Sequence, residues 1–244
     1  MRDNLVFIQG LRSLGLDLEK EQLDKFDRYY NLLIEWNSFM NLTAITEYEE
    51  VIQKHFLDSL SLIKSCKINP GDTLLDMGTG AGFPGIPLKI AFPELEVLLM
   101  DSLNKRINFL NEVITKLELN SIKTLHARAE EQARKEEYRE QFDLVVSRAV
   151  ARTASLVELC LPYVKKGGYF IPYKSGKVTE ELEEAEYALE CLGGKLDKKV
   201  TFTLPDTDVE RTLICIRKVK QTPKAYPRAG GKPLKMPLMK KNSE

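Results

Sequence analysis

The sequence predicts an α/β protein with a mostly parallel sheet and a helical N-terminal extension. From residue 69 onward, short apolar runs alternate with helical patterns. Strands that are separated by helices form right-handed crossovers, and these build a parallel sheet. The last two runs have no helix between them, which predicts an antiparallel hairpin at the end of the sheet. Residues 1–66 show only helical spacing.

The N-terminal extension is expected over residues 1–68. An apolar stripe at spacings of three and four residues predicts an amphipathic helix over 19–40. The stripe consists of Leu23, Phe26, Tyr30 and Leu33. Thr46 and Glu49 have the spacing of a capping box, in which each side chain satisfies a free amide at a helix start. A second helix is therefore expected over 46–64.

A second domain is expected over residues 69–220, with seven strands. The first five are predicted at 73–77, 95–100, 122–127, 142–147 and 167–173. The helices between and after them are predicted at 84–92, 103–118, 130–138, 153–165 and 177–192. The hairpin strands are expected at about 198–205 and 210–218.

The composition excludes several classes of protein. The chain has 244 residues, of which 43% are hydrophobic and 30% are charged, so it is neither disordered nor collagen-like. No run approaches the ~20 apolar residues of a membrane helix, and the N-terminus lacks the pattern of a signal peptide. The four cysteines form no CxxC pair, which argues against a zinc site or a disulfide framework. We therefore expect a cytoplasmic protein without a metal.

Positive charge is concentrated at the C-terminus. The segment from Arg217 to the end holds nine basic residues and one acid, a net charge of +8, against 27 basic and 35 acidic residues before it. A basic segment interrupted by Pro and Gly is typical of an arm that binds a polyanion. We expect residues 221–244 to form a flexible basic tail that is either such an arm or a solvated terminus.

The most specific segment is the glycine-rich turn after the first strand. Asp76 ends that strand, and Gly78, Thr79, Gly80 and Gly82 follow it. Such a loop lets a ligand approach the backbone closely at the carboxyl edge of the sheet. The pattern formally matches the dinucleotide fingerprint, but a carboxylate at Asp76 would repel a pyrophosphate and attract a cation. The cationic S-adenosylmethionine, which has no phosphate, is therefore favoured over a nicotinamide dinucleotide.

Polar residues also follow the second and third strands. Asp101 lies where an acid can accept hydrogen bonds from both ribose hydroxyls of a nucleoside, or can cap the helix that follows. Ala129 and Glu130 lie where a backbone amide would read the adenine edge. Glu130 could equally be an acid in the first turn of the next helix.

The fourth strand ends in Ser147-Arg148-Ala149-Val150. This tip lacks the Asn/Asp-Pro-Pro-aromatic motif of enzymes that methylate amines, and Cys160, Cys191 and Cys215 fit a core better than a nucleophile's position. A cationic Arg148 suits an acceptor nitrogen that carries no proton and needs no general base, so catalysis reduces to positioning. Arg148 could bind phosphate, a guanine edge or the cofactor carboxylate, or pair with Asp143 or a helix acid.

Taken together, these motifs resemble the ribosomal RNA small subunit methyltransferase G family, also called glucose-inhibited division protein B. The resemblance covers nearly the whole chain. It rests on Trp36-Asn37, Asn41-Leu42-Thr43, His55-x-x-Asp58-Ser59, LLDMGTGAGFPGIPLKI, Asp101-Ser102, Lys105-Arg106, Ala129-Glu130 and Ser147-Arg148-Ala149-Val150.

The resemblance implies a class I, Rossmann-like methyltransferase fold and methyl transfer from S-adenosylmethionine to N7 of a guanosine in 16S ribosomal RNA, leaving S-adenosylhomocysteine. The expected cofactor site comprises Asp76, Gly78, Thr79, Gly80, Phe83, Asp101, Ser102, Ala129, Glu130 and Arg148. The expected RNA contacts are Asn41, Lys105, Arg106, Arg228 and Lys232, with Asn41 in a substrate lid and His55 in a structural role. We expect a monomer that acts on 16S RNA or on the small subunit. A nicotinamide dehydrogenase and a non-catalytic RNA-binding module are the rival interpretations.

Overall fold

The computed structural model describes residues 4–148, 151–176 and 178–240. Ala149 and Val150, the last two residues of the motif at the end of the fourth strand, lie outside the described residues.

Helices make up the N-terminal extension, as the sequence predicts. The elements are α1 (Leu5–Ser13), α2 (Lys20–Met40) and a composite helix of α3 (Tyr48–Val51), the π-helical η1 (Ile52–Leu57), α4 (Asp58–Leu60) and the 3₁₀ helix η2 (Ser61–Lys64). The π turn places Ile52, Phe56 and Leu57 in the core.

The predicted capping box at Thr46 and Glu49 is wrong. The composite helix begins only at Tyr48, and no side chain caps its first turn. The carbonyl oxygen of Thr46 instead accepts the hydroxyl of Tyr30 at 2.9 Å, which fixes this residue in the loop before the helix. A reciprocal cap stands at the start of α2, where the backbone N–H of Glu19 donates to Oε1 of Gln22 at 2.9 Å.

Within the described residues, the strands form one seven-stranded sheet in the order β3-β2-β1-β4-β5-β7-β6. Its strands are β1 (Thr73–Met77), β2 (Glu96–Asp101), β3 (Ile122–His126), β4 (Phe142–Arg148), β5 (Val164–Lys174), β6 (Gly194–Thr203) and β7 (Glu210–Lys218). The strands β1 to β5 pair in parallel, whereas β7 is antiparallel to both β5 and β6. The predicted mostly parallel sheet with a C-terminal hairpin is confirmed.

The helices after the first strand are α5 (Gly85–Ala91), α6 (Asn104–Lys116), α7 (Ala129–Gln132), α8 (Thr153–Cys160), the 3₁₀ helix η3 (Leu161–Tyr163), α9 (Val178–Leu192) and α10 (Lys232–Lys235). Two predicted helices are too long. The helix expected over 130–138 ends after four residues, and the one expected over 153–165 gives way to β5 at Val164. The strand expected over 167–173 begins three residues earlier, and Gly168 lies inside it, where a Cβ would come within 2.6 Å of the Asp143 carbonyl oxygen.

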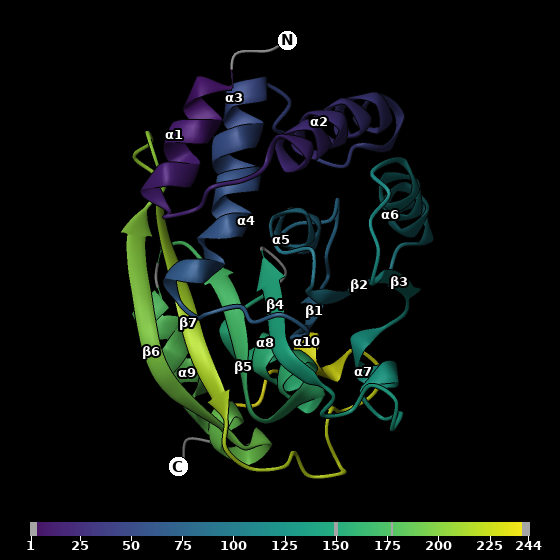
Figure 1. The fold of residues 1–244 in the computed structure, drawn as a ribbon. Coiled ribbons are helices and arrows are strands. Elements are labelled where there is room, and N and C mark those ends of the chain that lie inside the picture. The colour runs from purple at the N-terminus through teal and green to yellow at the C-terminus, as the bar shows by residue number, and fades with distance from the viewer. Residues whose placement is uncertain (1–3, 149–150, 177, 241–244) are drawn as a thin grey trace.

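The sheet has a hydrophobic core on each face. Successive residues of β1 point to opposite faces, so Leu74 belongs to one core and Leu75 to the other. The first core also contains α5, α6 and the N-terminal helices, while α8 and α9 belong to the second. In Figure 1 the N-terminal helices lie beyond the ends of β4 and β5. They are joined to the sheet there, because Tyr173 at the end of β5 donates its hydroxyl to the carbonyl of Ser59 at 2.7 Å.

The C-terminal segment is packed against the second core, in contrast to the flexible tail expected from its charge. The guanidinium of Arg139 donates to the carbonyls of Thr222, Pro223 and Tyr226 at 2.8–3.2 Å. Arg228 binds both carboxylate oxygens of Glu158, which is fully buried in α8. Charge counting missed this arrangement because the acidic partner lies 70 residues earlier in the chain.

Candidate functional site

The glycine loop leaves β1 at the carboxyl edge of the sheet. Its first two amides, of Gly78 and Thr79, donate to the carbonyl of Met100 in β2 at 2.9 and 3.1 Å. Gly80 has a φ of 62°, and a Cβ built on it would meet nothing within 4 Å. The loop therefore presents bare backbone to open space at Gly80, as a close ligand would require.

Asp76 holds the glycine loop in its conformation through hydrogen bonds. Its carboxylate is fully buried, and Oδ2 accepts the hydroxyl of Thr79 at 2.6 Å and the amide of Gly85 at 2.8 Å. Burial raises the pKa of Asp76 to about 6. In the described part of the chain, Oδ1 has no hydrogen-bond partner. The carboxylate thus fixes the turn with one oxygen and leaves the other unsatisfied.

Asp101 at the end of β2 ties the loop to the next helix. Its Oδ2 accepts the amide of Gly80 at 3.0 Å and the guanidinium of Arg106 at 3.1 Å, while Oδ1 accepts the amide of Leu103 at 2.9 Å. The alternative role as a helix cap is wrong: the residue at the N-cap of α6 is Leu103, and no described side chain caps that helix. Ser102 is exposed, and its carbonyl accepts Nε2 of His126 at 3.0 Å.

Ala129 and Glu130 form the first turn of α7. The carbonyl of Ala129 accepts the hydroxyl of Tyr163 at 2.6 Å. The Glu130 side chain is buried, and its Oε1 accepts the amide of Gly231 from the C-terminal segment at 3.2 Å. Glu130 therefore holds the segment against α7, a contact that nothing in the sequence indicated.

Arg148 at the end of β4 lies between the sheet and the N-terminal helices. It donates to Oδ2 of Asp58 at 2.8 Å, and Arg211 of β7 donates to the other oxygen, Oδ1, at 3.0 Å. The sequence left open whether Arg148 pairs with Asp143 or with an acid on a helix, and its partner is the helix residue Asp58. Asp143 binds Lys165 instead, at 2.9 Å. The guanidinium also lies 5.0 Å from the centre of the Phe83 ring, a distance typical of a cation–π contact.

His55 packs on the same ring. Its imidazole stacks on Phe83 with 4.5 Å between ring centres, and Nε2 hydrogen-bonds with the hydroxyl of Thr43 at 2.9 Å. Burial, and next the positive charge of Arg148, lower the pKa of His55 to about 3. The histidine is therefore neutral at pH 7, and the structural role expected from the sequence stays a prediction.

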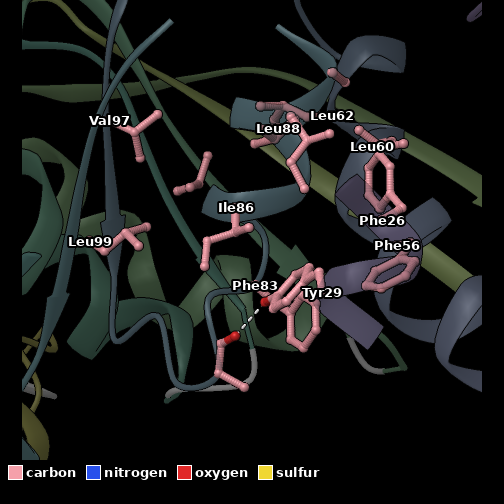
Figure 2. Close-up of a cluster of buried hydrophobic side chains, with 14 of the residues drawn as sticks. Phe26, Tyr29, Phe56, Leu60, Leu62, Phe83, Ile86, Leu88, Val97 and Leu99 are labelled. Carbon is pink, nitrogen blue, oxygen red and sulfur yellow. Dashed lines mark hydrogen bonds between the residues drawn. The ribbon is translucent and has the colours of Figure 1, made fainter. Parts of the chain in front are cut away.

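The aromatic cluster around Phe83 attaches the loop to the N-terminal helices. Figure 2 shows the Tyr29 and Phe83 rings beside one another, with 5.4 Å between their centres. The Tyr29 hydroxyl donates to the carbonyl of Ala81, and a Cβ on Gly82 would lie 2.8 Å from that hydroxyl oxygen. The loop conformation therefore depends on the helical extension.

A cavity of about 580 Å³ opens beside this cluster, at the ends of β4 and β5. Its lining is mostly charged or aromatic: Lys54, His55, Asp58, Arg148, Tyr173, Lys174, Glu181 and Arg211, with Ile45, Ala151, Leu156 and Ser175. Both carboxylates are paired, Asp58 with two arginines and Glu181 with Lys174 at 2.7 Å. The sequence indicated no role for Lys174, Glu181 or Arg211. Arg211 lies 153 positions from its partner Asp58, and no motif marks Lys174 and Glu181, seven residues apart.

The remaining predicted RNA contacts lie apart from this cavity lining. Asn41 is exposed at the end of α2 with a φ of 51°, and Lys105 is exposed in the first turn of α6. Lys232 is exposed in α10. Arg228 pairs with Glu158 at 2.7 Å, and the expectation that it also contacts RNA stays a prediction.

Within residues 4–148, 151–176 and 178–240, no group of three or more His, Cys, Asp or Glu side chains could hold a metal ion. The helices of the same residues include none that is long and apolar enough to cross a membrane.

Comparison with known proteins identifies the family. Residues 22–212 match the family model described as rRNA small subunit methyltransferase G. The chain is 83% identical to the ribosomal RNA small subunit methyltransferase G of Lachnoclostridium phytofermentans over 99% of this chain and 100% of that protein. It is 53% identical to the protein of that name from Acetivibrio thermocellus, over 96% of each chain. The chain belongs to this family.

A solved structure supports the fold independently. A SAM-dependent methyltransferase from Aquifex aeolicus superimposes with a TM-score of 0.52 at 18% identity, over 72% of this chain and 96% of that one. The predicted class I methyltransferase fold is thus confirmed. Residues 221–240 lie beyond the part matched by the family model. This segment includes Gly231, which donates to Glu130, and Arg228, which pairs with Glu158.

Proposed function

We propose that this protein transfers a methyl group from S-adenosylmethionine to N7 of a guanosine in 16S ribosomal RNA. The names of its relatives support methylation of small-subunit ribosomal RNA. The observation that carries the choice of acceptor is that every side chain in the cavity lining that could act as a general base already has a polar partner. Asp58 and Glu181 are both held by cations, and both ring nitrogens of His55 have polar neighbours. These groups suit an acceptor from which no proton must be removed.

The residues around the glycine loop fit S-adenosylmethionine. The unpartnered Oδ1 of Asp76 offers a buried negative charge to a cationic ligand, and the open space at Gly80 accommodates a close contact with the backbone. A dinucleotide would bring its pyrophosphate towards that carboxylate and be repelled. We propose that Gly78, Thr79, Phe83, Asp101, Ser102, Ala129 and Glu130 complete the cofactor site, and that Arg148 borders both cofactor and acceptor.

When bound, S-adenosylmethionine supplies an electrophilic methyl group. The chain's own contribution is orientation, because N7 of guanine already carries the attacking lone pair. The ion pair with Asp58 holds Arg148 at the cavity, where its guanidinium can hold the O6 edge of guanine or a phosphate. In-line transfer then needs alignment and exclusion of water rather than a general base.

For the RNA, we propose contacts with Asn41, Lys105, Arg106 and Lys232. We propose residues 1–68 as a substrate-facing helical subdomain and residues 69–220 as the methyltransferase domain. The protein would act as a cytoplasmic monomer, on 16S RNA or on the assembled small subunit.

The test is to incubate the protein with isotopically labelled S-adenosylmethionine and either deproteinised 16S RNA or small subunits, and then to map the labelled nucleotide by mass spectrometry. We expect 7-methylguanosine at one position. Label on another atom would contradict the proposed acceptor, and unlabelled RNA with retained RNA binding would favour the non-catalytic module. Calorimetry with S-adenosylhomocysteine and NAD decides between the two cofactors, since only the first should bind.

A further inference from the structure

The last turn of α2 carries an aromatic side chain on the surface. Phe39 is 65% exposed, and its ring is supported from behind by Trp36, with 5.4 Å between ring centres and 42° between planes. Trp36 in turn packs on Phe109 of α6 at 5.6 Å. Phe39 therefore presents a ring backed by another aromatic ring, with much of its surface open to solvent.

The basic residue Lys105 lies in the first turn of the neighbouring helix α6. The helices α2 and α6 run antiparallel, since Arg28 reaches the carbonyl of Lys116 at 3.4 Å near one end and Trp36 meets Phe109 near the other. Figure 1 shows the two helices adjacent. Phe39 lies about 4.5 Å beyond Trp36 along its axis, and Lys105 about 6 Å beyond Phe109 along the partner axis. The end of α2 and the exposed start of α6 therefore lie on the same side of the contact between Trp36 and Phe109.

We call Phe39, Leu103 and Lys105 the Phe39 patch. Leu103 is 43% exposed and Lys105 is exposed beside it. The patch borders the glycine loop through Arg106, which binds the Asp101 carboxylate that also accepts the Gly80 amide. It combines apolar surface with a positive charge at the rim of the proposed cofactor site.

The patch is also close to the cavity. Asn37 in the last turn of α2 accepts the amide of Thr43 at 2.9 Å, and Thr43 bonds to His55 in the cavity wall. Thr43 is only four positions after Phe39 in the chain, so their Cα atoms lie within roughly 14 Å of one another. A nucleotide at the patch would thus lie within a few nucleotides of one in the cavity.

A supported aromatic ring next to a cation is the usual chemistry for binding unpaired RNA, in which bases stack on aromatic faces and phosphates meet Lys or Arg. A guanosine whose ring enters a cavity must leave its own stack, which exposes the bases next to it. We propose that the Phe39 patch is a stacking platform for an unpaired base that flanks the methylated guanosine, with Lys105 at the adjoining phosphate. The inference rests on the proposed function and specifies how that site holds its RNA.

The first test measures binding without methyl transfer. The full-length protein is titrated with a short single-stranded oligoribonucleotide of mixed sequence, and quenching of the single tryptophan, Trp36, is followed alongside filter binding. We expect Phe39→Ala to weaken binding roughly fivefold to a hundredfold, and Phe39→Tyr to restore it. Lys105→Gln should reduce the slope of log affinity against log salt by about 0.7.

The control is Tyr187→Ala, which removes a partly exposed aromatic from α9, and it should leave binding unchanged. Thermal unfolding of each variant shows whether the fold is kept. Equal RNA affinity in Phe39→Ala and the wild type would overturn the stacking platform, as would loss of binding in Phe39→Tyr equal to that in Phe39→Ala.

The second test uses methyl transfer to 16S RNA. Phe39→Ala should raise KM for RNA by a factor similar to its loss of affinity, while the affinity for S-adenosylhomocysteine stays unchanged. If Phe39→Ala methylates 16S RNA with an unaltered KM for RNA, the stacking platform is refuted and the proposed function stands. Phe39-dependent oligoribonucleotide binding by a protein that transfers no methyl group refutes the proposed function and supports the patch.

Discussion

Arg148 shows how a single cation can be both a site residue and a structural one. Its side chain is largely buried and pairs with Asp58, which is 1% exposed and also binds Arg211. Removing one partner of a buried ion pair commonly costs about 3–5 kcal/mol, because the remaining charge is uncompensated. Here Arg211 still neutralises Asp58 when Arg148 is lost, so we expect a smaller loss of stability than for an isolated pair.

Substitution of Arg148 should therefore separate activity from folding. We expect Arg148→Ala, and also Arg148→Lys, to reduce methyl transfer to 16S RNA by at least about a hundredfold, since an ammonium group cannot reproduce the planar fork of a guanidinium. Methyl transfer and urea unfolding should be measured together. Arg152→Ala is the control, because that arginine is exposed in its pair with Glu184. Near-normal turnover in a folded Arg148→Ala protein would contradict the proposed role.

His55 makes the protein sensitive to acid. Arg148 of β4, Arg211 of β7 and Lys54 beside it surround the ring with positive charge, and burial and these charges hold its pKa at about 3, against about 6.5 when unfolded. Between about pH 6.5 and pH 3, His55 is thus protonated in the unfolded chain and neutral in the folded chain. The contribution of neutral His55 is complete above about pH 6.5 and is lost as the pH falls towards 3.

We expect the free energy of unfolding to fall more steeply with acidification in the wild type than in His55→Gln. Between pH 5.5 and 4 the slopes should differ by up to about 1.4 kcal/mol per pH unit, measured by urea unfolding. Asp76 acts in the opposite direction, since its raised pKa of about 6 makes protonation favour the folded state. Asp76→Asn is therefore the companion variant. Parallel curves for the wild type and His55→Gln would show that the histidine already carries its proton in the folded state.

At the scale of elements, the C-terminal segment is held by guanidinium groups at two places in its first half. Arg139 binds the carbonyls near Thr222, and Arg228 binds Glu158 with its backbone amide, Nε and Nη2 at 2.7–3.1 Å. Glu158 has no exposed surface, so its charge depends on this partner. The segment is consequently part of the fold and also reaches Glu130 through Gly231.

Arg228→Ala should destabilise the protein by about 3–5 kcal/mol, because it strands the buried Glu158 carboxylate. Glu158→Gln in the same chain should recover part of the loss, since the amide carries no charge. Urea unfolding of the two single variants and the double variant gives the coupling energy between them. Additive effects of the two substitutions would mean that the pair contributes no interaction energy to the fold.

The same segment shows where sequence reasoning stops. Alternation of apolar runs and helices predicted the seven strands and the hairpin, because periodicity is a local property. The glycine loop and Asp76 were likewise found together, since they lie in one stretch of chain. The Asp58–Arg148–Arg211 cluster and the Arg228–Glu158 pair join residues 70–153 positions apart, and no local pattern marks which charges will meet.

At the scale of the whole molecule, the N-terminal helices and the sheet share one core. Phe26, Tyr29 and Phe56 from the extension belong to the same cluster of buried side chains as Leu74, Phe83 and Leu99 from the methyltransferase domain. Figure 2 shows several of these side chains in one continuous group. The boundary expected near residue 68 therefore separates the helical extension from the sheet along the chain, but the two parts share one hydrophobic core.

We expect the two parts to unfold together, because neither can expose its face of this core without the other losing its packing. Trp36 is the single tryptophan and lies in α2, so its fluorescence reports the extension. Far-ultraviolet circular dichroism reports the helices and strands of the whole chain. Urea unfolding followed by the two signals should give the same midpoint and the same slope, and Tyr29→Phe, which removes the hydroxyl donated to Ala81, should lower both midpoints equally. A fluorescence transition that precedes the circular dichroism transition would instead identify the extension as a separate folding unit.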